Sequence, residues 1–267
     1  MDIRRRRFLG ASAWTAAVTT VAGTATACAG DARAPAASRA TAPARPTATA
    51  RPTAAAPAGT SGTPARHLSG EIVHGPRKYR QVALTFHGAG DPAVARRLLA
   101  AAAAAGARIT VLAVGNWLDA HPEMAQLILD GGHELGNHTQ HHADINAMTP
   151  AAAHAEIAQC AERLRKLTGT IGTWFRPSRT PHANMMVRTQ AAKVGYHSCL
   201  SYDVDSRDFQ DPGPDAIIRN VLRGVRGGSI VSMHFGHQGT VTAMPALLDG
   251  LRRRGLRAVT VSSLLSA

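Results

Sequence analysis

The sequence of residues 81–114 is QVALTFHGAGDPAVARRLLAAAAAAGARITVLAV. Its first apolar run, Gln81 to Phe86, predicts a β-strand. Asp91 stands at a helix-capping position and Pro92 at the first turn, so a helix is expected from Pro92 to Ala105, ended by Gly106. The run from Ile109 to Val114 predicts a second strand. A strand, a helix and a strand in about 34 residues indicate a βαβ unit with parallel strands.

The same alternation continues to the end of the chain. Further strands are expected at residues 134–136, 173–175, 197–201, 228–233 and 257–260, and helices at 122–129, 149–167, 184–194, 214–223 and 241–254. Strict alternation favours a parallel sheet with helical crossovers. About seven units in roughly 200 residues fit either a compact α/β barrel or a doubly wound sheet.

The N-terminal 66 residues have a different composition. Residues 1–28 contain four consecutive arginines, Arg4 to Arg7, then an uncharged run of small residues that ends at Cys28. This pattern is typical of a secretory signal peptide, and the small residues before Cys28 resemble a bacterial lipoprotein processing site. We expect the protein to be exported and anchored to the cell membrane through a lipid on Cys28, with ordinary signal cleavage as the alternative.

Residues 29–66 consist mainly of Ala, Pro, Thr and Arg, a composition that predicts a disordered linker. Residues 67–267 then form one domain. The net charge is +13, but nine arginines of the first 66 residues carry much of it. The domain has no basic stripe interleaved with aromatic residues, so no nucleic-acid partner is expected. Cys160 and Cys199 could pair in an oxidising compartment or remain free thiols.

Polar residues gather where the predicted strands end. His87, His138, Arg176, Asp205 and His234 each follow a different strand. Because the carboxyl ends of parallel strands meet at one edge, we expect these side chains to lie together. Histidines with an arginine and carboxylates at one edge suggest metal-assisted hydrolysis, in which one group takes the proton of water and another protonates the leaving amine.

The stretch Gly136-Asn137-His138-Thr139-Gln140-His141-His142 contains three histidines in five residues. His138 and His142 are four positions apart, so on a helical turn their rings would project from one face and could share a metal ion. His141 lies between them and is expected to point away.

These motifs together resemble the polysaccharide deacetylase family, also known as the NodB homology domain or carbohydrate esterase 4. The resemblance covers about residues 70 to 265. It rests on residues 136–142, on Phe175-Arg176-Pro177, on Asp203 to Phe209 and on Ile230 to His234. It implies a distorted (β/α)7 barrel and removal of N-acetyl, sometimes O-acetyl, groups from wall polysaccharides with zinc or a similar divalent ion.

The resemblance also implies roles for individual residues. His138 and His142 would be the metal-ligating histidines, and His234 the general acid. Arg176 would steady the catalytic base, and Asp205 would orient the catalytic histidine.

The first motif departs from the family pattern. The family has Thr-Phe-Asp-Asp-Gly-Pro, in which the first Asp is the base and the second binds the metal, whereas residues 85–92 read TFHGAGDP. In one interpretation Asp91 completes an Asp-His-His site and His87 is the base. In another, His87 completes a three-histidine site and Asp91 is the base. A third interpretation is an inactive site that only binds sugar. Asp91 could also simply cap the helix at Pro92.

The sequence thus predicts an exported, metal-dependent deacetylase with His87, Arg176, Asp205 and His234 in catalysis and Asp91, His138 and His142 on the metal. The expected partner is an N-acetylated cell-wall or extracellular polysaccharide, with membrane contact only through the N-terminal anchor and a monomeric state. The alternative is a non-catalytic carbohydrate-binding lipoprotein on the same fold. Ser178-Arg179-Thr180 replaces the family's Pro-aromatic-Gly in the groove wall, so substrate preference is expected to differ from that of typical chitin or peptidoglycan deacetylases.

Overall fold

The central strand of the fold is β2 (Gln81–Gly88), which pairs with three other strands. The structure is a computed structural model that describes residues 70–267. The expected signal peptide (1–28) and linker (29–66) lie outside the described residues. β2 is buried along almost its whole length because neighbouring strands and helices cover it, which explains why its sequence is a continuous apolar run.

The strands form two parallel sheets. The larger has the order β4-β3-β2-β7-β6, with β8 paired to the start of β2, and the smaller consists of β1 and β5. The remaining strands are β1 (Gly70–Ile72), β3 (Thr110–Ala113), β4 (Glu134–Asn137), β5 (Ser198–Leu200), β6 (Val204–Asp205), β7 (Ile230–His234) and β8 (Arg257–Val259). Single bridges from Phe175 to Asn137 and to Cys199 join the two sheets.

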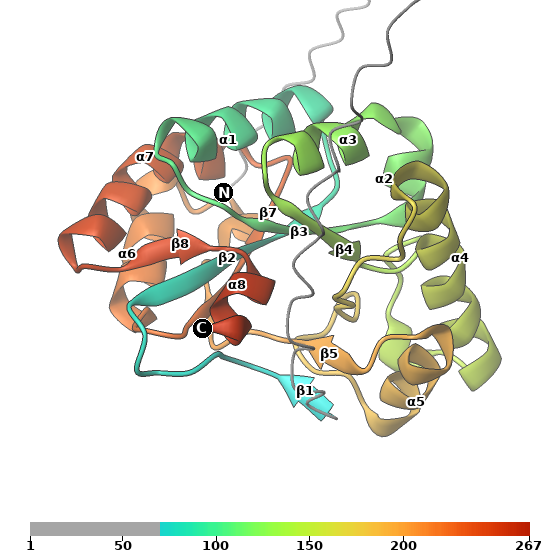
Figure 1. Cartoon of the computed structure of the whole chain (residues 1–267). Coiled ribbons are helices and arrows are strands. Elements are labelled where there is room, and N and C mark those ends of the chain that lie inside the picture. The colour runs from blue at the N-terminus through green and yellow to red at the C-terminus, as the bar shows by residue number, and fades with distance from the viewer. Residues whose placement is uncertain (1–69) are drawn as a thin grey trace, which may run out of the picture. The chain divides into compact units, whose positions relative to one another are not determined.

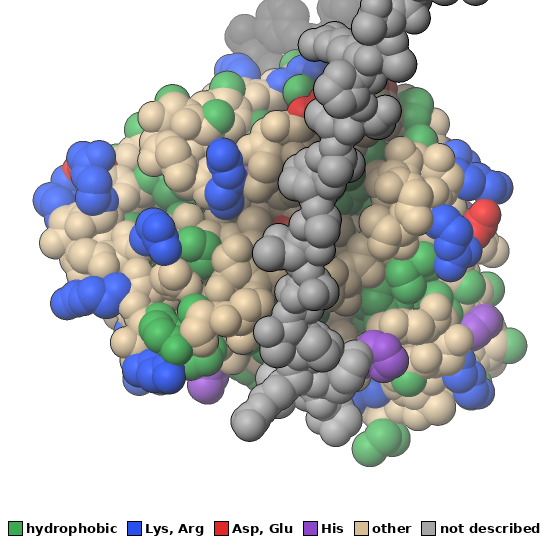
Figure 2. Space-filling model, viewed as in Figure 1, with side chains coloured by type: hydrophobic (Ala, Val, Ile, Leu, Met, Phe, Trp, Pro, Cys, Tyr) green, Lys and Arg blue, Asp and Glu red, His purple; other side chains and the backbone are tan. Residues whose placement is uncertain are grey.

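Apart from α8, which lies beside β2, the helices form an arc around these strands, as Figure 1 shows. They are α1 (Pro92–Ala104), α2 (Gly115–Ala120), α3 (Glu123–Asp130), α4 (Pro150–Thr168), α5 (Met185–Val194), α6 (Pro214–Gly224), α7 (Gln238–Arg253) and α8 (Val261–Ser266), with short 3-10 helices at Ile145–Ala147 and Asp208–Gln210. Within residues 70–267 no helix is long and apolar enough to cross a membrane. Basic side chains are scattered singly over the face seen in Figure 2.

The predicted α/β class with parallel strands is confirmed, and closure of the sheets into a complete barrel stays a prediction. The prediction of a strand at residues 173–175 was wrong, because only Phe175 makes strand-like bridges. The short strands β1 and β6 and the helices α2 and α8 were not predicted, since each is too short to show a clear periodicity. Cys160 and Cys199 are both free and buried.

The strand register fixes where the functional edge lies. His87 on β2 is directly opposite His234 on β7, and Ala113 on β3 is opposite Asn137, the last residue of β4. Asp205 ends β6, and Arg176 follows the bridge at Phe175. The carboxyl ends of parallel strands therefore bring residues separated by up to about 150 positions in the chain to one edge.

Candidate metal centre and active site

Three histidines from two strand ends and one loop converge at this edge. His87, His138 and His142 each offer a ring nitrogen, and these nitrogens lie within 4.8 Å of one another. The ring centroid of His138 is 4.2 Å from that of His87 and 4.9 Å from that of His142. Three imidazoles at this spacing form the donor set that proteins use for catalytic zinc.

His138 and His142 are brought together by a loop and not by a helical turn, which corrects the expectation from their spacing. The chain leaves β4 and reverses through Thr139 and His142, whose φ angles are 68° and 55°. The Asn137 side chain accepts the Thr139 N–H at 2.8 Å, and the Thr139 hydroxyl accepts the His142 N–H at 3.2 Å. These local bonds hold a left-handed backbone that non-glycine residues rarely adopt.

The protonation state of the three histidine rings favours binding of a metal ion. Nδ1 of His138 lies 3.0 Å from the Arg176 carbonyl oxygen. A carbonyl oxygen can only accept a hydrogen bond, so Nδ1 carries the proton of the neutral ring, and Nε2 keeps its lone pair. Nε2 of both His87 and His138 is buried without a hydrogen-bond partner among the described residues. Burial, reinforced by neighbouring histidines, lowers the pKa of His87 and of His138 well below the usual value, and burial also lowers the pKa of His142. Neutral rings with free lone pairs fit a divalent ion such as zinc.

Asp91 does not join this cluster. Its side chain caps α1 by accepting the Ala93 N–H at 2.8 Å, and the residue is exposed. The placement of Asp91 on the metal is therefore corrected: the helix end uses the carboxylate, because the first N–H groups of a helix have no partner within it. The geometry matches the interpretation in which His87 is the third metal ligand. That interpretation also made Asp91 the catalytic base, and the position of Asp91 at the α1 cap does not agree with this role.

The packing around Gly88 leaves no room for a carboxylate side chain next to His87. His87 and Gly88 occupy the positions of the two acidic residues in the family's first motif. A Cβ at Gly88 would lie 2.8 Å from a methyl carbon of Val111 and 3.0 Å from the Cα of Ala113. Strand β3 thus packs too closely against β2 for an aspartate at this position.

His234 is oriented by Asp208. Asp208 Oδ1 is 2.7 Å from Nδ1 of His234, and Oδ2 accepts the His234 backbone N–H and the Thr240 hydroxyl, each at 2.8 Å. Asp208 is fully buried, which by itself would raise its pKa, but these donors outweigh burial and the pKa is lowered. Nδ1 of His234 is thus held, and Nε2 is left for chemistry.

Asp205 does not orient His234, which corrects the role expected for it. One of its oxygens accepts the Arg207 N–H at 2.9 Å, and its side chain lines the pocket described below. Asp205 and Asp208 stand three residues apart in one motif, so spacing alone could not distinguish them. Arg207 adopts a left-handed conformation with a φ of 55°, which reverses the loop and turns Asp208 into the core.

Arg176 is fully buried at the base of the site. Its Nε and Nη2 donate to the carbonyls of Leu200 and Ser201 at 3.2 and 3.0 Å, and Nη1 has no partner among the described residues. Its guanidinium carbon lies 5.4 Å from the centre of the Tyr202 ring. Burial lowers the pKa of Arg176 to about 10, so it remains a cation at neutral pH, and it attracts the Asp205 carboxylate.

An open pocket of about 520 Å³ leads to these groups. It is lined by His87, His142, Arg179, Thr180, Pro181, Tyr202, Asp205, Phe209, Ser232, His234 and His237. His138 lies below it, fully buried. His141 points away and bonds Glu156, and Nδ1 of His237, a residue of the pocket lining, is 2.8 Å from Asp211. Sequence reasoning missed Tyr202 and Thr240, because neither belongs to a recognisable motif.

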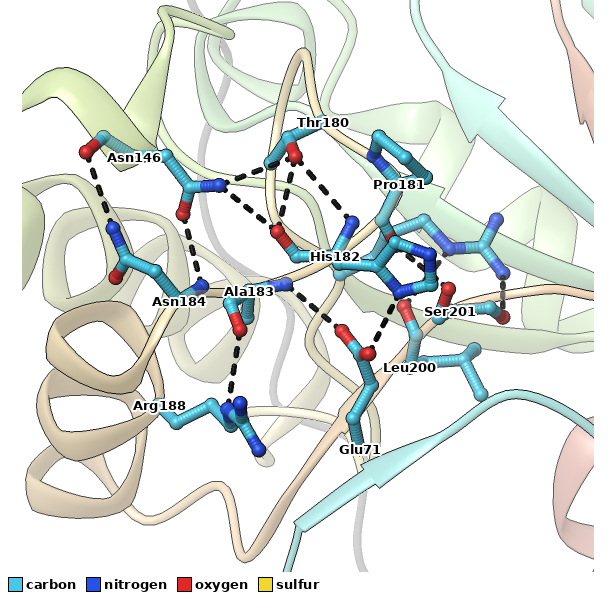
Figure 3. Close-up of polar contacts among 11 residues, drawn as sticks. Glu71, Asn146, Thr180, Pro181, His182, Ala183, Asn184, Arg188, Leu200 and Ser201 are labelled. Atoms are coloured by element: carbon cyan, nitrogen blue, oxygen red, sulfur yellow. Dashed lines mark hydrogen bonds and ion pairs between the residues drawn. The ribbon is translucent and has the colours of Figure 1, made fainter.

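Residues 180–184, which begin in the pocket wall and continue away from it, are fixed by a network of polar contacts, shown in Figure 3. Glu71, on β1, accepts the backbone N–H of Ala183 and contacts Nδ1 of His182, both at 2.8 Å. The Ser201 hydroxyl donates to the Pro181 carbonyl at 2.7 Å, and the Asn146 side chain donates to the His182 carbonyl at 2.9 Å. Segments far apart in the sequence therefore hold this loop in one conformation.

Comparison with known proteins gives a consistent result. The family described as polysaccharide deacetylase matches residues 74–199. A peptidoglycan-N-acetylglucosamine deacetylase of Bacillus cereus is 29% identical over 206 residues, which cover 76% of this chain and 94% of the relative. A chitooligosaccharide deacetylase of Rhizobium leguminosarum bv. phaseoli is 30% identical over 176 residues, covering 59% of this chain and 75% of the relative.

The fold also matches solved structures. BA3943 of Bacillus anthracis, described as a carbohydrate esterase 4 family pseudoenzyme, superposes with a TM-score of 0.70 and 22% identity over 74% of this chain and 69% of its own. This similarity shows a shared fold. With the sequence relatives and the motifs at the strand ends, it leads to one conclusion: the chain belongs to the polysaccharide deacetylase family.

Proposed function

We propose that the domain is a metal-dependent hydrolase that removes N-acetyl or O-acetyl groups from a cell-envelope polysaccharide. The observation that carries this proposal is the His87–His138–His142 cluster, with its buried and unpartnered Nε2 atoms, next to the His234–Asp208 pair in an open pocket. The sequence relatives named as deacetylases of peptidoglycan and chitooligosaccharides support the substrate class.

Each residue has a distinct role in this proposal. The three histidines hold a divalent ion, with zinc the best match to an all-imidazole site, and such an ion supplies Lewis acidity to water and to the acetyl carbonyl. His234 holds a proton at Nε2 and passes it to the leaving amine, with Asp208 stabilising the imidazolium. Asp205 is the carboxylate among the pocket-lining residues and takes the proton from water, and the buried Arg176 cation attracts it.

Two measurements test this function. The zinc content of the purified protein is compared with that of a His138→Ala/His142→Ala double variant, which removes two of the three donors; retention of one ion per chain by the double variant would refute the site. Acetate release from N-acetylated oligosaccharides is measured for the zinc-loaded wild type and for His234→Ala. We expect release by the wild type and a loss of at least about 100-fold in the variant.

A second candidate function is carbohydrate binding without catalysis. The observation that favours it is the loss of both acidic positions of the first motif, now His87 and Gly88, with Asp91 committed to the α1 cap. The structural similarity to BA3943, itself described as a pseudoenzyme, is in line with this alternative. Oligosaccharide binding without acetate release, across N- and O-acetylated substrates and several divalent ions, would establish it.

We also propose that the protein acts outside the cytoplasm, attached to the membrane through a lipid on Cys28. The support is the arginine-rich start and the small residues before Cys28 in the sequence. The test is fractionation of cells that produce the wild type or Cys28→Ala. The wild type is expected in the membrane fraction and the variant in the soluble extracytoplasmic fraction.

A further inference from the structure

Arg179 is a charged residue of the pocket wall, and the proposed reaction assigns no role to it. It lines the pocket with His87 and His142, and it is exposed. Its backbone is left-handed, with a φ of 56°, a conformation that costs a residue with a Cβ about 1–2 kcal/mol. Such a conformation persists only where the surrounding structure enforces it.

The loop around Arg179 is held on both sides. The Ser178 hydroxyl donates to the Ala143 carbonyl at 2.5 Å and accepts the Thr139 hydroxyl at 3.1 Å. On the other side, Thr180 accepts a hydrogen bond from Asn146, and the Pro181 carbonyl accepts one from Ser201 (Figure 3). The backbone that carries Arg179 is therefore held in place, which reduces the entropy that the loop loses when it binds a ligand.

Arg179 has no ion-pair partner within residues 70–267. Asp205, the carboxylate of the pocket lining, accepts the Arg207 N–H and forms no ion pair with Arg179, and the nearby Asp211 is paired with His237. Buried Arg176, behind Tyr202, attracts the Asp205 carboxylate. The Arg179 guanidinium thus faces whatever enters the pocket without an ion-pair partner among the described residues.

We infer that Arg179 is a specificity-determining residue that selects polysaccharides carrying a carboxylate on the acetylated sugar or on its neighbour. A planar guanidinium matches a carboxylate with two parallel hydrogen bonds, which an aromatic side chain at this position could not make. The inference rests on the proposed function, because it places the acetylated sugar in this pocket. It narrows the substrate class from N-acetylated polysaccharides in general to acidic ones.

The experiment uses a matched pair of oligosaccharides built from N-acetylglucosamine, one with a carboxyl-bearing ether on alternate sugars and one with that carboxyl converted to a methyl amide. Affinity is measured by calorimetry, and acetate release in parallel, for the wild type, Arg179→Gln and Arg179→Lys. Arg219→Gln, an exposed arginine on α6 outside the pocket lining, controls for the change in net charge. A phosphate-bearing oligomer distinguishes carboxylate selection from general anion binding.

The wild type is expected to bind the acidic oligomer about 3- to 10-fold more tightly than the amide, with the preference reduced in 0.5 M salt. Arg179→Gln should remove the preference, while Arg179→Lys retains part of it and Arg219→Gln all of it. Equal affinity for the two oligomers in the wild type, an unchanged preference in Arg179→Gln, or a stronger preference for phosphate would overturn the inference. Absence of acetate release with the binding preference intact would refute the hydrolase function alone.

Discussion

Replacing Asp208 with Asn tests the assignment of the acid. Asp208 accepts three hydrogen bonds of 2.7–2.8 Å in a fully buried site, two from His234 and one from Thr240. An amide has only one acceptor oxygen. If that oxygen keeps the His234 backbone N–H and the Thr240 hydroxyl, the amide NH₂ faces Nδ1 of His234. The ring proton must then move to Nε2.

The consequence can be estimated from these contacts. The imidazolium form of His234 carries a proton on both nitrogens, so in Asp208→Asn it loses a charge-assisted bond and a buried counter-charge. Together these losses are about 3–5 kcal/mol, or a fall of about 10²- to 10⁴-fold in kcat/KM for acetate release. The unsatisfied amide also destabilises the fold by about 1–3 kcal/mol, a decrease in Tm of about 2–12 °C for a domain of this size.

The assay combines kinetics, thermal melting and ¹⁵N NMR of the histidine rings. Melting separates lost chemistry from lost structure, and the NMR shifts report whether the His234 proton moves from Nδ1 to Nε2. Asp211→Asn is the matched control, because Asp211 also contacts a pocket histidine, His237, but is exposed. A kcat/KM within about threefold of the wild type, or an unchanged His234 tautomer, would refute the reasoning, as would an equal loss in Asp211→Asn.

Three further predictions concern the cluster and its neighbours. Zinc at 100 times its Kd should stabilise the wild type by about 2.7 kcal/mol in thermal melts but leave His138→Ala unchanged; an equal gain in both would exclude His138 as a ligand. In metal-free protein, burial lowers the pKa of His87 and of His138, so as the pH falls these histidines take up protons in the unfolded chain before they do so in the folded one. Urea titrations should therefore show the full free energy of unfolding above pH 6.5 and a loss of up to about 1.4 kcal/mol per pH unit per histidine below it. The slope should be shallower in His87→Asn. A pH-independent stability would contradict this. Gly88→Asp should lower the free energy of unfolding by about 1–3 kcal/mol, because its Cβ meets Val111 and Ala113 on β3; a neutral effect in the same titration would show that β3 can move.

Much of the fold and of the site's location could be predicted from local pattern. Apolar runs separated by helical segments predicted β2, β3, β4, β5, β7 and β8, and α1 begins at Pro92 as its capping residues indicate. His87, His138, Arg176, Asp205 and His234 each follow or end a strand-like segment, so parallel pairing alone brings them to one edge. The family resemblance, carried by the same residues, is confirmed by the comparisons.

Several roles could not be predicted, for physical reasons that differ. An aspartate at position 91 fits either a helix cap or a metal ligand by sequence, and only the folded backbone shows that Asp91 caps α1. Asp208 rather than Asp205 reaches His234, because the left-handed Arg207 reverses the loop between them. Thr173 to Phe175 reads as a strand, but only Phe175 finds bridge partners.

The sequence by itself determined the alternation of strands and helices, the edge at which the chemistry gathers and the residue types that gather there, because these follow from periodicity and from the parallel direction of the strands. Only the tertiary structure decided which side chains complete the site. The meeting of His87, His138 and His142 depends on pairing across β2, β3 and β4 and on left-handed residues in the loop after β4. Those are non-local and conformational properties, and a linear pattern of residues does not specify them.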